Sequence, residues 1–314
     1  MAGYRKLALA TGLATFVLIL VGGVVRVSDS GLGCGPAGSG FHGWPFCNGD
    51  VVPGVDLNSI IEYAHRALAI VVGLMILALF VLAVRRHRPL VPATGLLLML
   101  VVAQGALGGA TVEGNLEEAY VAAHLGLAML MLGTILYIWR VTRGARPVAG
   151  GPRLRPLAIA TTAAVFCTIV AGGYMAGTQN YGRADYQLGD GAHHACGKEF
   201  PSCNGEAMPF GQSRLVDIHL THRAFMYLAT LLAIALVAVA LRRRVAVGYA
   251  WAVGALLVAQ ILVGALNVWL DEYELLILAH LALGTLLWTA SLSLTLELAP
   301  ARQRAARAAK AVTA

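Results

Sequence analysis

Four histidines lie inside long apolar segments, where ionisable side chains are rare. They are His65, His124, His222 and His280. An ionisable group within a membrane-spanning segment is costly, so such a residue usually has a function. Each histidine is about five or six residues, or about 8 Å, into a helix expected to enter from the outer side. Because the four share one depth, the pattern favours ligands over four unrelated core residues.

Haem is the ligand that best suits two histidines in each half of the chain. Imidazole is a common axial ligand of haem iron, and helix bundles hold cofactors between facing helices. Zinc or copper would need three or four converging ligands. For any single histidine, the alternative is a hydrogen-bonded core residue. Several glycines would make room for a macrocycle or serve close helix packing: Gly105, Gly108, Gly109, Gly126, Gly264 and Gly284.

Three charged residues adjoin these histidines. Arg66 and Arg223 each directly follow a proposed ligand, where a guanidinium can bind a haem propionate or extend to lipid headgroups. Glu62 lies three residues before His65 on the same helix face, while His219 occupies the matching position in the second half. A carboxylate at this position in only one half indicates that the two halves have different roles. In that half, the carboxylate would move protons or stabilise positive charge. Its alternative is an interfacial ion pair with Arg66.

The elements that must position these residues are membrane-spanning helices. Of the 314 residues, 58% are hydrophobic and 12% are charged, which excludes an ordinary soluble enzyme. The apolar segments are long enough to span a bilayer and predict an all-α polytopic membrane protein with eight transmembrane helices. Their expected ranges are 7–25, 60–84, 91–112, 119–139, 156–176, 216–241, 247–269 and 274–297.

The basic residues set the expected orientation. The chain has 23 Lys and Arg against 16 Asp and Glu, for a net charge of +7. These residues alternate with the apolar segments and form no single patch, so the pattern excludes a nucleic-acid partner. Most of them flank the same ends of the helices, which by the positive-inside rule predicts cytoplasmic N- and C-termini. We therefore expect a multi-pass protein of the cell membrane, in contact with lipid.

The sequence also repeats at a nearly constant offset. Gln104 and His124 align with Gln260 and His280 at an offset of 156. Because each half has an even number of spans, the repeat is parallel and predicts two four-helix bundles side by side. The expected units are an N-terminal half at 1–142, a cytoplasmic linker at 143–155, a C-terminal half at 156–298 and a basic cytoplasmic tail at 299–314.

Four cysteines fall in two loops expected on the outer side, Cys34 with Cys47 and Cys196 with Cys203. Oxidising surroundings allow disulfides there. Pairing within each loop is the economical arrangement, because each loop then closes over its own half. The Cys-x-x-Cys and Cys-x-x-Cys-His patterns are absent, so neither thioredoxin-like chemistry nor covalent c-type haem attachment is supported.

In combination, these features resemble the haem A synthase family over essentially the whole chain. The resemblance rests on eight spans in two similar halves, on Glu62-x-x-His65-Arg66, His124, His219-x-x-His222-Arg223 and His280, and on the loop cysteines after Ser30-Gly31-Leu32-Gly33. The first loop departs from the family pattern, because twelve residues separate Cys34 from Cys47 where the family has a tighter pair.

The resemblance implies an oxidoreductase that converts the C8 methyl group of haem O into the formyl group of haem A, usually by two hydroxylations. It implies that His222 and His280 hold a resident haem b, while His65 and His124 receive the substrate, haem O. Glu62 would serve the reacting methyl group. Haem O synthase and an electron donor are further implied partners.

Two other functions fit parts of this pattern. A dihaem b-type cytochrome that oxidises a quinol would hold two resident haems, and Glu62 argues against it. A transporter built from parallel repeats would hold no haem. The haem extracted from the protein distinguishes the three functions.

Overall fold

Eight long α-helices make up the computed structural model, which describes residues 1–144, 151–178, 191–270 and 274–299. All eight are long and apolar enough to cross a membrane. The all-α membrane fold expected from the sequence is therefore confirmed. The helices are α1 Ala2–Val27, α2 Leu57–Arg86, α3 Val91–Glu113, α4 Glu118–Thr142, α5 Gly151–Gly177, α6 Arg214–Arg242, α7 Val247–Trp269 and α8 Glu274–Glu297.

Polar caps begin two of these helices. Asp56 Oδ1 accepts a hydrogen bond from the Ser59 N–H at 2.9 Å at the start of α2, and hydrogen bonding by Ser59 lowers the pKa of Asp56. Ser213 Oγ accepts one from the Val216 N–H at 3.2 Å at the start of α6. Such caps satisfy backbone donors that have no partner within the helix. They explain why α2 and α6 begin two or three residues before the predicted spans.

The starts of α1 and α5 differ most from the expected ranges, because α1 begins at Ala2 instead of residue 7 and α5 at Gly151 instead of residue 156. The apolar span of α5 was expected to begin at residue 156, directly after the linker at 143–155. The helix instead begins at Gly151 and continues through Pro156. Proline removes one backbone hydrogen bond but keeps a helical φ, so the helix can pass through it. Residues 151–155, expected in the linker, are therefore helical, while residues 145–150 and 300–314 lie outside the described residues.

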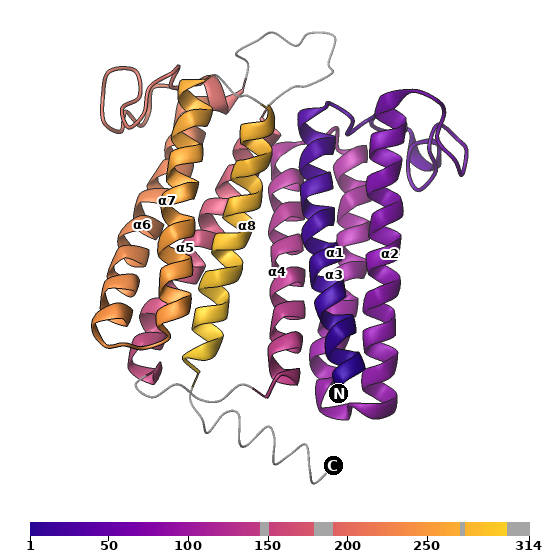
Figure 1. Ribbon diagram of the computed structural model, residues 1–314. Coiled ribbons are helices and arrows are strands. Elements are labelled where there is room, and N and C mark those ends of the chain that lie inside the picture. Colours follow the sequence, from indigo (N-terminus) through magenta and orange to yellow (C-terminus); the bar gives the residue numbers. More distant parts are fainter. Residues whose placement is uncertain (145–150, 179–190, 271–273, 300–314) are drawn as a thin grey trace.

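The helices pack as two groups of four (Figure 1). In the first group α1 and α3 each pack against both α2 and α4, and in the second α5 and α7 each pack against both α6 and α8. The two groups meet mainly along α4 and α5, with further contacts of α8 against α1 and α4. That the groups are related by a parallel repeat stays a prediction from the sequence.

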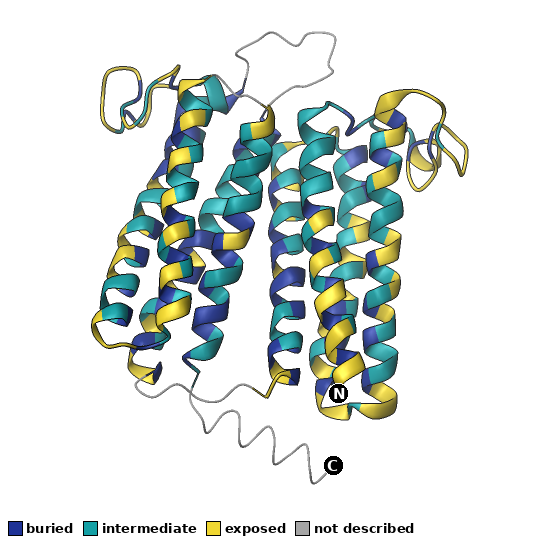
Figure 2. Cartoon of the chain, in the orientation of Figure 1, coloured by how far each residue is buried: buried dark blue, intermediate teal, exposed yellow. Residues whose placement is uncertain are grey.

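Exposed residues occur along the outside of the bundle (Figure 2), and many of the exposed residues are large and apolar. Trp251 and Trp269 are both exposed, near opposite ends of α7. At 1.5 Å per residue they are about 27 Å apart along the helix. Tryptophan is enriched at the two surfaces of a hydrocarbon layer about 30 Å thick. This face of α7 therefore has the features of a lipid-facing surface.

Glycines allow the two groups to approach closely. A β-carbon on Gly133 of α4 would lie 2.5 Å from the Trp288 ring of α8, and one on Gly177 of α5 would lie 2.4 Å from the Cα of Glu118 in α4. Both distances are shorter than van der Waals contact. The contact between the groups thus depends on positions that have no side chain.

We expect Gly133→Ala to lower the free energy of unfolding by about 1 to 3 kcal/mol, because the new methyl group must displace Trp288 from a packed contact. Gly73→Ala in α2 is the matched control, since a β-carbon there meets nothing within 4 Å. That change should shift stability by less than about 1 kcal/mol. Thermal unfolding in detergent measures both variants. Equal melting temperatures for the two would contradict the proposed contact.

Candidate functional site

The four predicted histidines lie near the same end of the bundle. His65 and His222 are in the first third of α2 and α6, and His124 and His280 are in the first third of α4 and α8. Segments 28–56 and 191–213, which contain both disulfides, are at this end. We call it the disulfide end. The N-terminus lies at the opposite end (Figure 1).

Each of these histidine rings lies against a glycine of the preceding helix. The absence of a side chain makes room for the ring. A β-carbon at any of the four glycines would lie closer to the ring than ordinary van der Waals contact. The distances from such a carbon to the nearest ring atom are 3.2 Å for Gly22 and His65, 3.3 Å for Gly108 and His124, 3.0 Å for Gly172 and His222, and 2.9 Å for Gly264 and His280. The same arrangement thus occurs four times.

The other glycines expected to line a cavity have different neighbours. A β-carbon on Gly284 would meet Gln260 at 3.1 Å, and one on Gly126 would meet Val170 of α5 at 3.2 Å. Gly126 therefore serves packing between the two groups. A β-carbon on Gly105 would meet nothing within 4 Å.

His222 and His280 face each other across the second group. Their ring centroids are 6.4 Å apart, and the ring planes are inclined by 66°. Two imidazoles that bind one metal from opposite sides, with bonds of about 2 Å, have centroids roughly 6 Å apart. His222 Nδ1 donates a hydrogen bond to the Thr168 carbonyl at 2.9 Å, which leaves Nε2 free to bind a metal. The pair therefore fits the two axial ligands of a haem.

Some of the histidine nitrogens have no hydrogen-bond partner. In the described part of the chain, Nδ1 of His124 and Nδ1 of His280 are buried without one. An unpartnered buried polar atom is costly and uncommon in a folded protein. Both pairs thus have the donor chemistry and the unsatisfied atoms expected where a ligand is to be bound.

Two glutamines reach the histidines from neighbouring helices. Gln104 Nε2 donates to the His124 carbonyl at 3.0 Å, and Gln260 Nε2 lies 3.2 Å from His280 Nε2. Sequence analysis used these glutamines to align the halves but did not assign them to the site. The available signal was a polar residue that recurs at the same offset as the histidines, inside an apolar helix.

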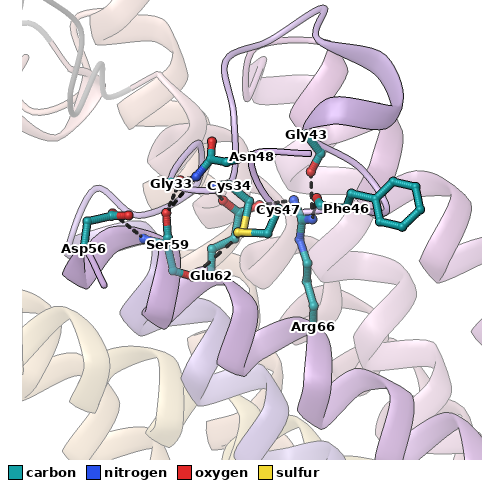
Figure 3. Close-up of a disulfide and its surroundings, with 10 residues drawn as sticks. All are labelled: Gly33, Cys34, Gly43, Phe46, Cys47, Asn48, Asp56, Ser59, Glu62 and Arg66. Carbon is teal, nitrogen blue, oxygen red and sulfur yellow. Dashed lines mark hydrogen bonds and ion pairs between the residues drawn. A yellow bond between two sulfur atoms is a disulfide. The ribbon is translucent and has the colours of Figure 1, made fainter. Parts of the chain in front are cut away.

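Glu62 is buried between α2 and the first disulfide loop (Figure 3). Its Oε2 accepts a hydrogen bond from the Cys34 N–H at 2.8 Å, and its Oε1 pairs with Arg66. The ion pair is the arrangement expected of an interfacial glutamate. Glu62 is also one turn before His65 on the same helix, so its carboxylate could lie beside a ligand bound to His65. The catalytic role stays a prediction.

The two arginines that follow the histidines bind the disulfide loops. Arg66 donates to the carbonyls of Gly43 and Phe46, both at 2.8 Å. Arg223 donates to loop carbonyls of the second half, of which that of Ser202 is nearest at 2.7 Å. Each guanidinium therefore fixes the loop that covers its own group of helices. Binding to haem propionates stays a prediction for both.

The expected disulfides, Cys34–Cys47 and Cys196–Cys203, are both formed. The structure also reveals a similarity between the loops that sequence analysis missed. After its second cysteine, each loop turns back on itself. Cys47 pairs with Asp50 and Cys203 pairs with Glu206, each in a short antiparallel bridge. The similar segments are Trp44-Pro45-Phe46-Cys47-Asn48-Gly49 and Phe200-Pro201-Ser202-Cys203-Asn204-Gly205, at the same offset of 156 as the helices.

His219, which replaces Glu62 in the second half, also contacts its loop. It is buried, and its Nδ1 donates a hydrogen bond to the Ala192 carbonyl at 2.7 Å. Both positions thus connect a helix to the loop above it. One does so with a carboxylate that accepts, and the other with an imidazole that donates.

Comparison with known proteins yields consistent matches. The COX15-CtaA family of cytochrome oxidase assembly proteins matches residues 55–292, which include Glu62, all four histidines and the second disulfide. The chain is 30% identical to the haem A synthase of Symbiobacterium thermophilum over 293 residues, covering 85% of this chain and 86% of that one. It is 29% identical to the haem A synthase of Halalkalibacterium halodurans over 239 residues, covering 72% and 73%.

We expect Gly264→Ala to reduce the amount of haem bound per protein, because the added methyl group would lie 2.9 Å from the His280 ring and turn it away. Gly248→Ala, on the same helix, is the matched control, since nothing lies within 4 Å of a β-carbon there. Haem content after extraction into alkaline pyridine measures the effect. Equal haem content in the two variants would show that the His280 ring is not held as the structure indicates.

Proposed function

Because the chain belongs to the COX15-CtaA family of cytochrome oxidase assembly proteins, we propose that it is a haem A synthase. It would oxidise the C8 methyl group of haem O to the formyl group of haem A. The observation that carries the proposal is the His222 and His280 pair, whose separation of 6.4 Å suits two axial ligands of one iron. The matching glycine and histidine contacts in the first group support a second haem-binding pocket.

The two pockets would have different occupants. His222 and His280 would hold a resident haem b, whose iron supplies one-electron redox chemistry when bound. His65 and His124 would hold the substrate, haem O. The difference between Glu62 and His219 supports this assignment, because the carboxylate belongs to one group alone. A reacting substrate needs a group that handles protons, whereas a resident haem does not.

Glu62 would act on the substrate through its carboxylate. Arg66 and the Cys34 N–H hold its two oxygens, so the side chain has little freedom to move. In this fixed position it would accept a proton, or stabilise positive charge, as the methyl group is oxidised. Burial under the first loop would keep bulk water from the carboxylate.

The membrane orientation follows from the disulfides and the basic residues. Both disulfides lie at one end of the bundle, and disulfides persist on the oxidising side of a membrane. Arg85, Arg86, Arg242 and Arg243 lie at the other end, where the positive-inside rule places the cytoplasm. We propose the cell membrane as the location and cytoplasmic termini. Haem O synthase and an electron donor would be partners.

Variants of the histidines test the two pockets. We expect His222→Ala or His280→Ala to abolish the b-type absorption spectrum, because each change removes an axial ligand from the same iron. His65→Ala or His124→Ala should retain that spectrum and lower haem A formation. Absorption spectra and chromatography of the extracted haems measure both effects. A full b-type spectrum in both second-half variants would overturn the assignment of the resident haem.

A substitution of Glu62 tests the chemistry. Glu62→Gln keeps the size of the side chain and removes its charge, while Arg66 keeps its loop carbonyls. The variant should bind haem b and haem O normally but accumulate haem O or a hydroxylated intermediate. Glu118→Gln is the control, since it removes a carboxylate that pairs with Arg214 and not with the arginine after a proposed ligand. If Glu62→Gln forms haem A at the wild-type rate, the carboxylate has no catalytic role and is only a structural partner of Arg66.

A further inference from the structure

An aromatic residue in the first disulfide loop bridges two helices at the disulfide end. Arg66 of α2 binds the carbonyls of Gly43 and Phe46, on either side of the Trp44-Pro45 pair. The Trp44 indole lies against α3, because a β-carbon on Gly109 would be 3.0 Å from the ring. Trp44 therefore spans from α2 to α3, and it is 37% exposed.

This contact is adjacent in sequence to the histidine contacts of the first group. Gly109 directly follows Gly108, the residue whose missing side chain makes room for the His124 ring. Arg66 directly follows His65. Along α3, Gly109 is one residue nearer the disulfide end than Gly108, and the Arg66 side chain of α2 reaches the loop from one residue beyond His65.

The second loop places Phe200 in the equivalent position, with stronger contacts. The Phe200 ring packs edge to face against Trp269 of α7, with centroids 6.3 Å apart and planes inclined by 70°. The Arg223 guanidinium lies 5.5 Å from the centroid of the same ring. An aromatic pair and a cation–π contact both resist displacement of the ring.

The residues beneath the two aromatic rings differ at matching positions. Where α7 has Ala265 and Trp269, α3 has Gly109 and Glu113, so Trp44 rests on bare backbone and has no aromatic partner at the position of Trp269. The loops differ as well. The first disulfide joins residues 13 apart in sequence and the second joins residues 7 apart. Phe200 thus has an aromatic partner at the position where α3 has Glu113, and it belongs to the shorter disulfide loop.

We propose that Trp44 and Phe200 cap the two haem pockets, and that the weaker hold on Trp44 lets the first pocket exchange its porphyrin while the second retains its own. This inference rests on the proposed function and states how one site can take up substrate and release product. A cap must move before a covered ligand can leave, so its contacts set the release rate. Trp44 is then a positioning residue for the exchangeable porphyrin.

Transfer of haem to excess apomyoglobin tests this directly, using the purified protein with both pockets filled by ferric haem b. The wild type should release haem in a fast and a slow phase. Trp44→Ala should accelerate only the fast phase, by roughly two- to tenfold, which corresponds to about 0.4 to 1.4 kcal/mol for the lost packing on Gly109. Phe200→Ala should accelerate only the slow phase. Trp44→Phe should stay close to the wild type.

Glu113→Trp is the complementary variant, since it places in α3 the aromatic residue that holds Phe200 in α7. It should slow the fast phase. A single release phase in the wild type, or an unchanged fast phase in Trp44→Ala, would overturn the inference. Melting temperature and haem spectrum confirm that each variant is folded. Because release is measured without turnover, a protein that makes no haem A but shows these shifts would overturn the proposed function alone.

Discussion

An imidazole ring inside an apolar helix bundle is the constraint on which this structure depends. Such a ring needs space and needs partners for its two nitrogens, and lipid supplies neither. The helices provide the space with a glycine opposite each ring. They provide only some of the partners, such as the Thr168 carbonyl for His222, and leave Nδ1 of His124 and His280 without one in the described residues. In the proposed function, a bound iron would complete what the protein leaves unsatisfied.

The loops at the disulfide end convert two similar helix groups into two different sites. In both, an arginine next to a ligand histidine binds carbonyls of a disulfide-closed loop. The first group adds a carboxylate held by Cys34 and Arg66, and covers its pocket with a lightly held tryptophan. The second has an imidazole in place of the carboxylate and a firmly held phenylalanine. In the proposed function, differences at a few loop-facing positions would thus distinguish a reactive pocket from a retaining one.

The sequence predicts most of the helices because apolar length is a strong signal in a membrane protein. The ranges of α7 and α8 agree with the structure, whereas α5 begins five residues before the expected range, at Gly151 instead of 156. The carbonyls that bind Arg66 and Arg223 could not be predicted, because any residue can supply a carbonyl. Trp44 and Phe200 could have been found from the repeat in the loops. Their contacts with Gly109 and Trp269 required the structure, since spacing does not show which residue covers a pocket.

The central claim is that one iron can bind between the histidines of each pair. Iron-edge anomalous scattering from crystals of the protein loaded with haem b and haem O tests it most directly. The account predicts two iron positions, one between His222 and His280 and the other between His65 and His124, at similar depth from the disulfide end. An iron bound between histidines of different pairs, or away from all four, would contradict it.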